Sequence, residues 1–479
     1  MPPDGDDAAI AGGLQRRLGR RQMTMLGLGG AIGTGLFLGS SLAISEAGPG
    51  VILAYAACAL VALVIAFALA EMVSVHPLTG SFGTLAQMYL GAGAGFVVRW
   101  TYWAIQVIAV GGEMIAIGIY TQYWWPQLPL WLPVAVFSVA LLVINAITVS
   151  MFGEVEYWFS MVKVVAIVAF ILLGACYLFF GLPGHSSPGS GNLTAHGGFL
   201  PHGLHGLALA FVFVIFSFIG TEVVAVTAAE SKNPERDIPR AARSMIARLS
   251  LFYVLAIGIV VTLVPWTVTA TDGALSASPF VRLFGIAGLP AAASVMNFVV
   301  LTAALSSSNT NIYLTTRMLH SLALDRYAPR SLGRVSRGGV PRLALLASAA
   351  GLALAAILSV YSPNNAYEAM FGISVFGALV VWILILATHA AFRRERGRST
   401  APVAAAPVRL RGAPVTTALA ALALAAILVS TGFINGMTIA WKAGIPFFAV
   451  LVIAYAILAR RRSGQRVRDD MPTTMRSAK

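Results

Sequence analysis

Long apolar segments dominate this 479-residue chain and restrict its fold more than any other feature. About 20 apolar residues in a helix span the hydrocarbon core of a bilayer, where backbone polar groups must be paired within the structure. Twelve such segments are present, at about 23–45, 48–72, 96–121, 131–150, 157–181, 204–229, 246–267, 284–316, 343–361, 365–390, 414–434 and 443–460. The sequence therefore predicts an all-α, polytopic membrane protein with twelve transmembrane helices.

The composition excludes the common alternatives to a membrane protein. Only 10% of the residues are charged, 58% are hydrophobic and the mean hydropathy is +0.82. Soluble domains carry about 25% charged residues, and disordered chains have low hydrophobicity. The two cysteines, Cys58 and Cys176, both lie in apolar segments, so neither a disulfide framework nor a CxxC metal site is predicted. We expect no metal ion and no organic cofactor.

The basic residues indicate how the chain is oriented in the membrane. If both termini lie on one side, 28 of the 32 Lys and Arg residues fall on that side, within 16–21, 232–248, 317–342, 393–411 and 460–479. Cytoplasmic loops carry such an excess of Lys and Arg. We therefore expect cytoplasmic termini in the cell inner membrane. The net charge of +14 then predicts attraction to anionic membrane lipid, and no nucleic-acid partner.

Glycine is concentrated in the first apolar segment, which contains GLGGAIGTGLFLG at 27–39. Each glycine weakens a helix interior by about 1 kcal/mol relative to alanine. Within a membrane, unwound backbone is tolerated only where it is buried in protein or lines a cavity. Small residues also allow close helix packing. From these glycines alone, a broken helix and a tightly packed helix are both open.

A matching glycine motif in the sixth segment favours the broken helix. The motif IGTE at 219–222 resembles IGTG at 32–35. The two motifs lie five segments apart, which is an odd number, so the segments that carry them run in opposite directions across the membrane. Paired interruptions of this kind indicate a transporter site. Broken helix ends attract an anion at free N–H groups and a cation at free carbonyls, which suits the zwitterionic form of an amino acid.

Six stretches identify a family resemblance. They are LGGAIGTGLFLGS at 28–40, AGPG at 47–50, FGEVEYWFSMVKVVAIV at 152–168, FSFIGTE at 216–222, AAESKNPERDIPRA at 228–241 and NFVVLTAALSSSN at 297–309. The chain resembles the amino acid–polyamine–organocation (APC) superfamily, in its bacterial amino acid transporter branch. The resemblance implies a LeuT-like inverted repeat of five plus five helices, discontinuous helices 1 and 6, and two appended helices.

This resemblance also implies how the chain is divided. The expected parts are a cytoplasmic tail at 1–22, a first repeat at 23–181, a second repeat at 204–390, helices 11 and 12 at 414–460, and a cytoplasmic tail at 461–479. Proton-coupled uptake by alternating access is implied in the same way.

The family site can be transferred to matching positions. The resemblance implies that the N–H groups of Thr34 and Gly35, with the Thr34 hydroxyl, hold the substrate carboxylate. Main-chain carbonyls of Ala31, Phe216 and Ile219 then bind the ammonium group. The whole predicted substrate site is Ala31, Thr34, Gly35, Phe216, Ser217, Ile219 and Gly220.

Other residues are candidates for the lid and the side-chain pocket. Phe216 and Phe218 flank the second interruption, and we expect only one of them to face the cavity. The run of serines before Asn309 could line the pocket or form interhelical hydrogen bonds. Weaker candidates for the side-chain pocket are Ile105, Val110, Ser306 and Asn309.

Three ionisable residues within the spans are candidates for proton coupling or gating, because a charge at the bilayer centre costs at least about 2.5–3.5 kcal/mol. Lys163 could extend to the membrane surface, but the resemblance places it at the break of helix 1. Glu222 could cap exposed N–H groups, whereas the resemblance assigns it gating or proton linkage. For Glu113, a packing role and a pocket role stay open. Glu156 is expected on the cytoplasmic side with Glu154. The residues expected near span ends, facing water or paired with basic loop residues, are Glu71, His76, Glu154 and Glu230.

The predicted function is secondary active transport of amino acids into the cell, by proton symport of neutral L-amino acids. The pocket candidates are mostly apolar, and only Glu113 is free to neutralise a cationic side chain. Exchange of an amino acid for an amine, and permeases for cationic amino acids or GABA (γ-aminobutyric acid), are the alternatives. An enzyme is not predicted, because the spans contain no HExxH, no GxSxG and no Ser-His-Asp constellation.

Overall fold

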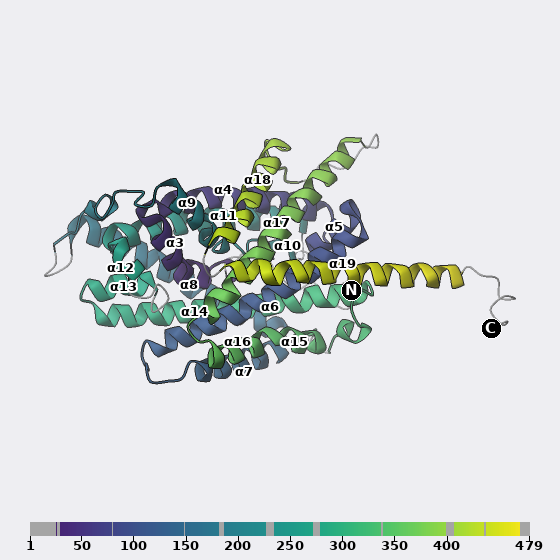
Figure 1. Ribbon diagram of the computed structural model, residues 1–479, viewed down its shortest axis with the longest axis horizontal. Helices are drawn as coiled ribbons and strands as arrows, with labels where there is room; N and C mark the ends of the chain where they lie inside the picture. Colours follow the sequence, from purple (N-terminus) through teal and green to yellow (C-terminus); the bar gives the residue numbers. More distant parts are fainter. Residues whose placement is uncertain are drawn as a thin grey trace, which may run out of the picture.

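The computed structural model shows an elongated bundle of helices (Figure 1). It describes residues 25, 29–78, 80–147, 149–181, 186–226, 234–271, 278–336, 339–398, 407–434 and 437–469. No strand occurs among these residues, as expected for the predicted all-α class. The predicted tail at 1–22 and residues 470–479 lie outside them.

The helices follow the predicted apolar segments, each of which overlaps at least one of them. The last helix extends to Asp469, so the start of the predicted C-terminal tail is helical. In chain order the helices are α2 (Thr34–Phe37), α3 (Gly39–Ala47), α4 (Val51–Val75), α5 (Ser81–Leu90), α6 (Ala92–Gln122), α7 (Trp131–Ile147), α8 (Val149–Phe180), α9 (Gly203–Phe216), α10 (Val223–Val226), α11 (Pro234–Leu263), α12 (Trp266–Thr271), α13 (Pro279–Ile286), α14 (Pro290–Leu324), α15 (Arg342–Ser348), α16 (Ala350–Tyr361), α17 (Ala366–Arg398), α18 (Val415–Ser430) and α19 (Thr438–Asp469).

Nine helical runs in the described residues are long and apolar enough to cross a membrane, so the chain is a multi-pass membrane protein. The first run, Thr34–Val75, contains two predicted spans, because only the 3-10 turn Gly48–Gly50 separates α3 from α4. The apolar helices α7 and α9 are shorter than the other spans. Twelve spans and the inverted repeat therefore stay predictions.

The centre of the bundle is formed by α6 and α14, which pack along each other (Figure 1). In their most apolar stretches, 83% of the α6 residues and 67% of the α14 residues are buried. The corresponding fraction is only 11% in α19, whose apolar side chains therefore face lipid. Small residues on α14, such as Ser306 and Ser307, allow close approach of neighbouring helices.

One end of this central pair is held by a buried arginine. The guanidinium of Arg99 on α6 donates to Asp325 Oδ2 (2.6 Å) and Ser321 Oγ (3.1 Å) at the end of α14. It also donates to Gln87 Oε1 on α5 (2.5 Å) and to Gly95 O (3.1 Å). A buried charge is tolerated when it is paired and hydrogen-bonded in this way. Arg99 thereby joins α5, α6 and α14.

Candidate functional site

The first predicted interruption is present in the structure. Residues 29–31 are helical, Ile32 and Gly33 form a bend, and α2 begins at Thr34. Gly33 has extended backbone angles (φ −132°, ψ −155°) and precedes α2 without a side-chain cap. Carbonyl groups at this bend are consequently released from the helical hydrogen-bond pattern.

The second predicted interruption lies directly against the first. Helix α9 ends at Phe216, a series of turns follows, and α10 begins at Val223. Gly220 has a φ of +103°, and a Cβ atom there would lie 2.6 Å from Gly30 O. A Cβ atom on Gly35 would lie 3.0 Å from Ser217 Cα. Glycine is therefore required where the two backbones meet.

A small polar cavity lies between the two interruptions. Its volume is about 20 Å³, roughly enough for one water molecule. Four predicted substrate-site residues line it: Ala31, Gly35, Phe216 and Ile219. Its other lining residues are Gly30, Gly33, Gln106, Ala109, Glu113, Ser307 and Asn311. Thr34, Ser217 and Gly220 are adjacent in the chain but do not line this space.

Lys163 joins α8 to the first interruption. The side chain is 1% exposed, and Nζ donates to Gly29 O (2.6 Å) and Ile32 O (2.8 Å). These contacts do not fit a lysine that extends to the membrane surface. The ammonium group instead binds the carbonyls that the bend releases, as the family resemblance implies.

Glu156 is buried beside Lys163, although the sequence suggested a cytoplasmic position for it. Its carboxylate accepts hydrogen bonds from Ser306 Oγ (2.5 Å) and Asn309 Nδ2 (3.3 Å), and it interacts electrostatically with Lys163. The expectation of a water-facing Glu156 is wrong because α14 covers this face of α8. The seven-residue separation of Glu156 and Lys163 could have revealed their common face, since residues seven apart lie on one side of a helix.

The contacts of Glu156 also explain two of the weaker pocket candidates. Ser306 and Asn309 bind this carboxylate and do not line the small cavity. They are interhelical hydrogen-bond residues in the structure, which is one of the two readings that the sequence left open.

Glu113 faces the small cavity. Both carboxylate oxygens lie 3.4 Å from the Thr34 nitrogen, whose N–H points to them, and Ser307 Oγ donates to Oε1 at 3.1 Å. Of the two readings, the structure therefore favours a pocket residue. The Glu113 carboxylate lies where the resemblance implies that the substrate carboxylate binds.

Glu222 stabilises the second interruption from within. Its Oε2 atom accepts the Gly220 N–H at 3.0 Å, and its Oε1 atom accepts the Tyr102 hydroxyl at 3.3 Å. Gln106 in turn donates to the Tyr102 hydroxyl at 3.2 Å and to Asn311 Oδ1 at 3.2 Å. This chain of contacts connects the turn with α6 and α14. A capping role and a gating role are both compatible with it.

Aromatic side chains enclose the site, and the sequence reasoning missed several of them. Tyr253 on α11 donates its hydroxyl to Ala31 O at 2.8 Å. Phe216 packs against Phe371 on α17, with ring centroids 4.3 Å apart. Phe218 is fully buried and packs on Tyr253. Phe216 therefore faces the cavity and Phe218 belongs to the core, as expected for only one of the pair. Tyr253 carries no local motif that could have identified it.

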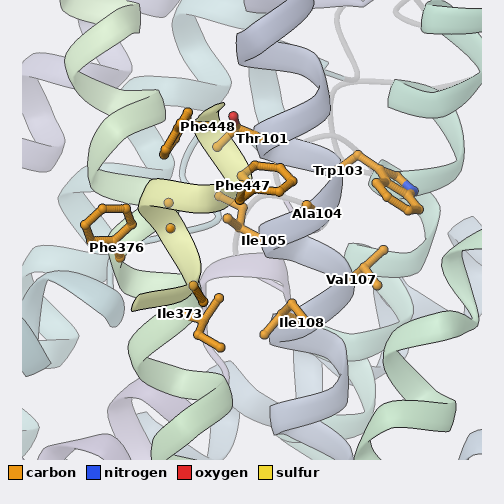
Figure 2. Close-up of a pocket in the computed structure, with 13 residues that line it drawn as sticks. Thr101, Trp103, Ala104, Ile105, Val107, Ile108, Ile373, Phe376, Phe447 and Phe448 are labelled. Atoms are coloured by element: carbon orange, nitrogen blue, oxygen red, sulfur yellow. The ribbon is translucent and has the colours of Figure 1, made fainter. Parts of the chain in front are cut away.

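A second, larger cavity of about 350 Å³ lies between α6, α17 and α19 (Figure 2). Figure 2 shows Ile105 here among Phe376, Phe447 and Phe448, so this pocket candidate faces away from the small cavity. Val110 is buried and lines neither space. Because no charged side chain of the described residues lines the larger cavity, these residues offer no charged partner for a zwitterion.

Comparison with known proteins identifies the family. The family model described as "Amino acid permease" matches residues 22–466. A probable threonine/serine transporter of Bacillus subtilis is 39% identical over 93% of this chain and 95% of its own length. An aromatic amino acid transport protein of Escherichia coli K12 is 40% identical over 92% of this chain and 95% of its own length. A γ-aminobutyric acid permease of Bacillus subtilis is 38% identical over 95% of this chain and 96% of its own length.

A solved structure shares the fold. The manganese transporter of Eremococcus coleocola superposes with a TM-score of 0.56 over 92% of this chain and 94% of its own, at 14% sequence identity. At this identity the similarity concerns the fold alone.

Proposed function

Because this chain belongs to the amino acid permease family, we propose that it imports neutral L-amino acids across the inner membrane by proton symport. The observation that carries this proposal is the contact between two interrupted helices around a small polar cavity. Backbone groups at such interruptions bind the charged ends of small substrates in transporters. Cytoplasmic termini and alternating access are part of the same proposal.

The backbone groups suit the two charges that amino acids share. In this proposal the N–H groups of Thr34 and Gly35 bind the carboxylate, and the carbonyls of Ala31, Phe216 and Ile219 bind the ammonium group. The Tyr253 hydroxyl already occupies Ala31 O. A carbonyl oxygen has two lone pairs, so one remains for the substrate. Since the present cavity holds about one water molecule, the two interruptions must separate to admit an amino acid.

The preference for neutral substrates is supported by the lining of the cavity and by the relatives. Among the described residues, Glu113 is the one carboxylate that lines the cavity, and it is engaged by Thr34 and Ser307. The relatives are named for threonine and serine, aromatic amino acids and γ-aminobutyric acid, none of which has a charged side chain.

Lys163 provides a route for proton coupling. Its ammonium group binds Gly29 O and Ile32 O on the flank of the first interruption, and it interacts with the carboxylates of Glu113 and Glu156. Loss of the Lys163 proton weakens the hydrogen bonds from Nζ to both carbonyls, because a neutral amine is a poorer hydrogen-bond donor than an ammonium group. The position of the first interruption then depends on the protonation of Lys163.

Uptake by purified protein in proteoliposomes tests the proposal. With an acidic outer solution and no substrate inside, we expect labelled neutral amino acids to accumulate. A competition screen with all common amino acids then identifies the substrate. Uptake that requires an internal amino acid or amine would establish exchange instead, and competition by lysine and arginine alone would establish a cationic substrate.

Glu113→Gln tests the pocket role of this carboxylate. We expect the variant to bind substrate with a weaker pH dependence than the wild type, because a neutral amide beside Thr34 does not repel the substrate carboxylate at any pH. Coupling between two ligands is typically about 5- to 150-fold in affinity. Substrate affinity should therefore fall from pH 5 to pH 8 in the wild type and fall less in Glu113→Gln. Glu368→Gln, which changes a half-buried carboxylate on α17, is the control. Equal pH dependence in all three proteins would assign Glu113 to packing.

A further inference from the structure

A third cavity lies at the arginine-rich end of α17, far from the small polar cavity. Its volume is about 290 Å³, and it lies between the end of α17 and the start of α18. His389, one of its lining residues, is 18 residues along α17 from Phe371, which contacts Phe216 at the second interruption. A rise of about 1.5 Å per residue places the two regions roughly 27 Å apart. This cavity is therefore separate from the proposed substrate site.

One wall of the cavity is an anchored arginine. Arg393 donates from Nη2 to Glu71 Oε2 at 2.6 Å and to Leu410 O at 2.8 Å. Glu71 is buried and also accepts from His389 Nε2 and Leu410 N. The Arg393 Nε atom is buried and has no hydrogen-bond partner in the described part of the chain. The guanidinium is thus held in place by Glu71 and Leu410.

The next residue supplies a second cationic group. Arg394 also lines the cavity, is exposed, and makes no hydrogen bond or ion pair within the described residues. Two described segments surround the cavity, 389–398 and 407–417. They contain one carboxylate, Glu395, and a second carboxylate, Glu71, is bound to Arg393. The arginines of the same segments are Arg393, Arg394, Arg396, Arg398, Arg409 and Arg411. The surface at this cavity therefore attracts an anion.

The remaining walls are mostly apolar. Ala390, Ala413 and Pro414 line the cavity together with the arginines, and the other two lining residues, His389 and Thr417, lie within hydrogen-bond distance of each other at 3.3 Å. Only 28% of the apolar stretch of α18 is buried in the protein, so the other side chains of this helix face lipid. An occupant must therefore be anionic where it meets Arg393 and Arg394, and apolar where it leaves the cavity along α18. A phospholipid has this combination, whereas a free phosphate ion has only the charge.

We propose that the cavity between α17 and α18 binds an anionic phospholipid through the phosphate of its headgroup. The volume equals that of about ten water molecules in the liquid, which suits a glycerophosphate group. The acyl chains would then lie outside the cavity, along α18. The distribution of Lys and Arg predicts that this end is cytoplasmic, and basic pockets between helices on that side recognise anionic headgroups. The site links two helices and is independent of what the protein transports.

Native mass spectrometry of the full-length protein in detergent tests this proposal. The probes are phosphatidylglycerol, phosphatidylcholine and inorganic phosphate. We expect the wild type to retain phosphatidylglycerol in preference to phosphatidylcholine. Arg394→Gln should weaken phosphatidylglycerol binding about five-fold, since one arginine near a membrane surface contributes about 1 kcal/mol to attraction of anionic lipid. Ala390→Phe should reduce it as well, because the ring fills the cavity without changing the charge.

The matched control is Lys442→Gln, which also removes one exposed positive charge. Lys442 lies near the start of α19, at the end of its membrane-spanning part that is opposite to its arginine-rich end. It should leave phosphatidylglycerol binding unchanged. Equal retention of both lipids by the wild type, or equal effects of Arg394→Gln and Lys442→Gln, would overturn the proposal. So would unchanged binding in Ala390→Phe. Displacement of phosphatidylglycerol by excess inorganic phosphate would show a site for the free ion and not for a lipid.

Discussion

Proteoliposomes that contain Lys163→Ala are expected to show no proton-driven accumulation of substrate. In the wild type, Nζ binds Gly29 O and Ile32 O, and alanine leaves both carbonyls without this donor. A pH difference of one unit stores about 1.36 kcal/mol per proton, which supports accumulation of up to about tenfold for one proton per substrate. The accumulation ratio should fall from this value to one. Uptake after an acid-outside jump, without internal substrate, measures it.

Two measurements separate loss of coupling from loss of folding in Lys163→Ala. Elution as a single peak in size-exclusion chromatography shows that the variant is folded, and binding of labelled substrate shows that the cavity still forms. Lys442→Ala is the matched control, because Lys442 is exposed at the start of α19 and should not affect accumulation. Full accumulation by Lys163→Ala would remove this lysine from the coupling mechanism.

Gly220→Ala should reduce transport on the order of 100-fold. Gly220 has a φ of +103°, which L-residues rarely adopt, and a new Cβ atom would lie 2.6 Å from Gly30 O. Since Gly30 O belongs to backbone, the contact can be relieved only if the two interruptions move apart. A displacement of about 1 Å at a site can cost 100-fold in rate. Initial rates of uptake at equal protein content measure the effect.

The matched control for this substitution is Gly91→Ala. Gly91 lies between α5 and α6 with a φ of +102°, so alanine there would also need a φ that L-residues rarely adopt. No atom of the described part of the chain lies within 4 Å of a Cβ at Gly91, so the contact with a second helix is missing there. We expect nearly wild-type transport. If both variants lose transport equally, strain alone explains the result and the close approach of the interruptions is unimportant.

Part of the site could be predicted because its signals are local in the sequence. The glycine motifs at 32–35 and 219–222 mark the interruptions. Within a membrane, a helix gives up its backbone hydrogen bonds only where the backbone is buried in protein or lines a cavity. Lys163 was identifiable because a charge is costly in the middle of an apolar segment. Glu156 was misplaced, because near a span end a carboxylate can face either water or a neighbouring helix.

Other contacts required the folded chain. Tyr253 meets Ala31 O, and Ser307 meets Glu113, across sequence separations of 222 and 194 residues. A tyrosine or serine in an apolar segment has no periodicity that reveals which helix it will face. The cavity between α17 and α18 is likewise made by side chains whose sequence signal is only a high density of arginine.

The amino-acid sequence is enough to predict that the chain crosses a membrane, where its helices break and which family it resembles. These properties follow from hydropathy, glycine and short motifs, each of which acts over a few neighbouring residues. Three contacts become visible only in the folded chain: Glu113 faces Thr34, Glu156 is buried beside Lys163, and Phe216, not Phe218, borders the cavity. Rotation and packing of helices set these contacts, because each helix presents several faces and its neighbours select the one that is buried.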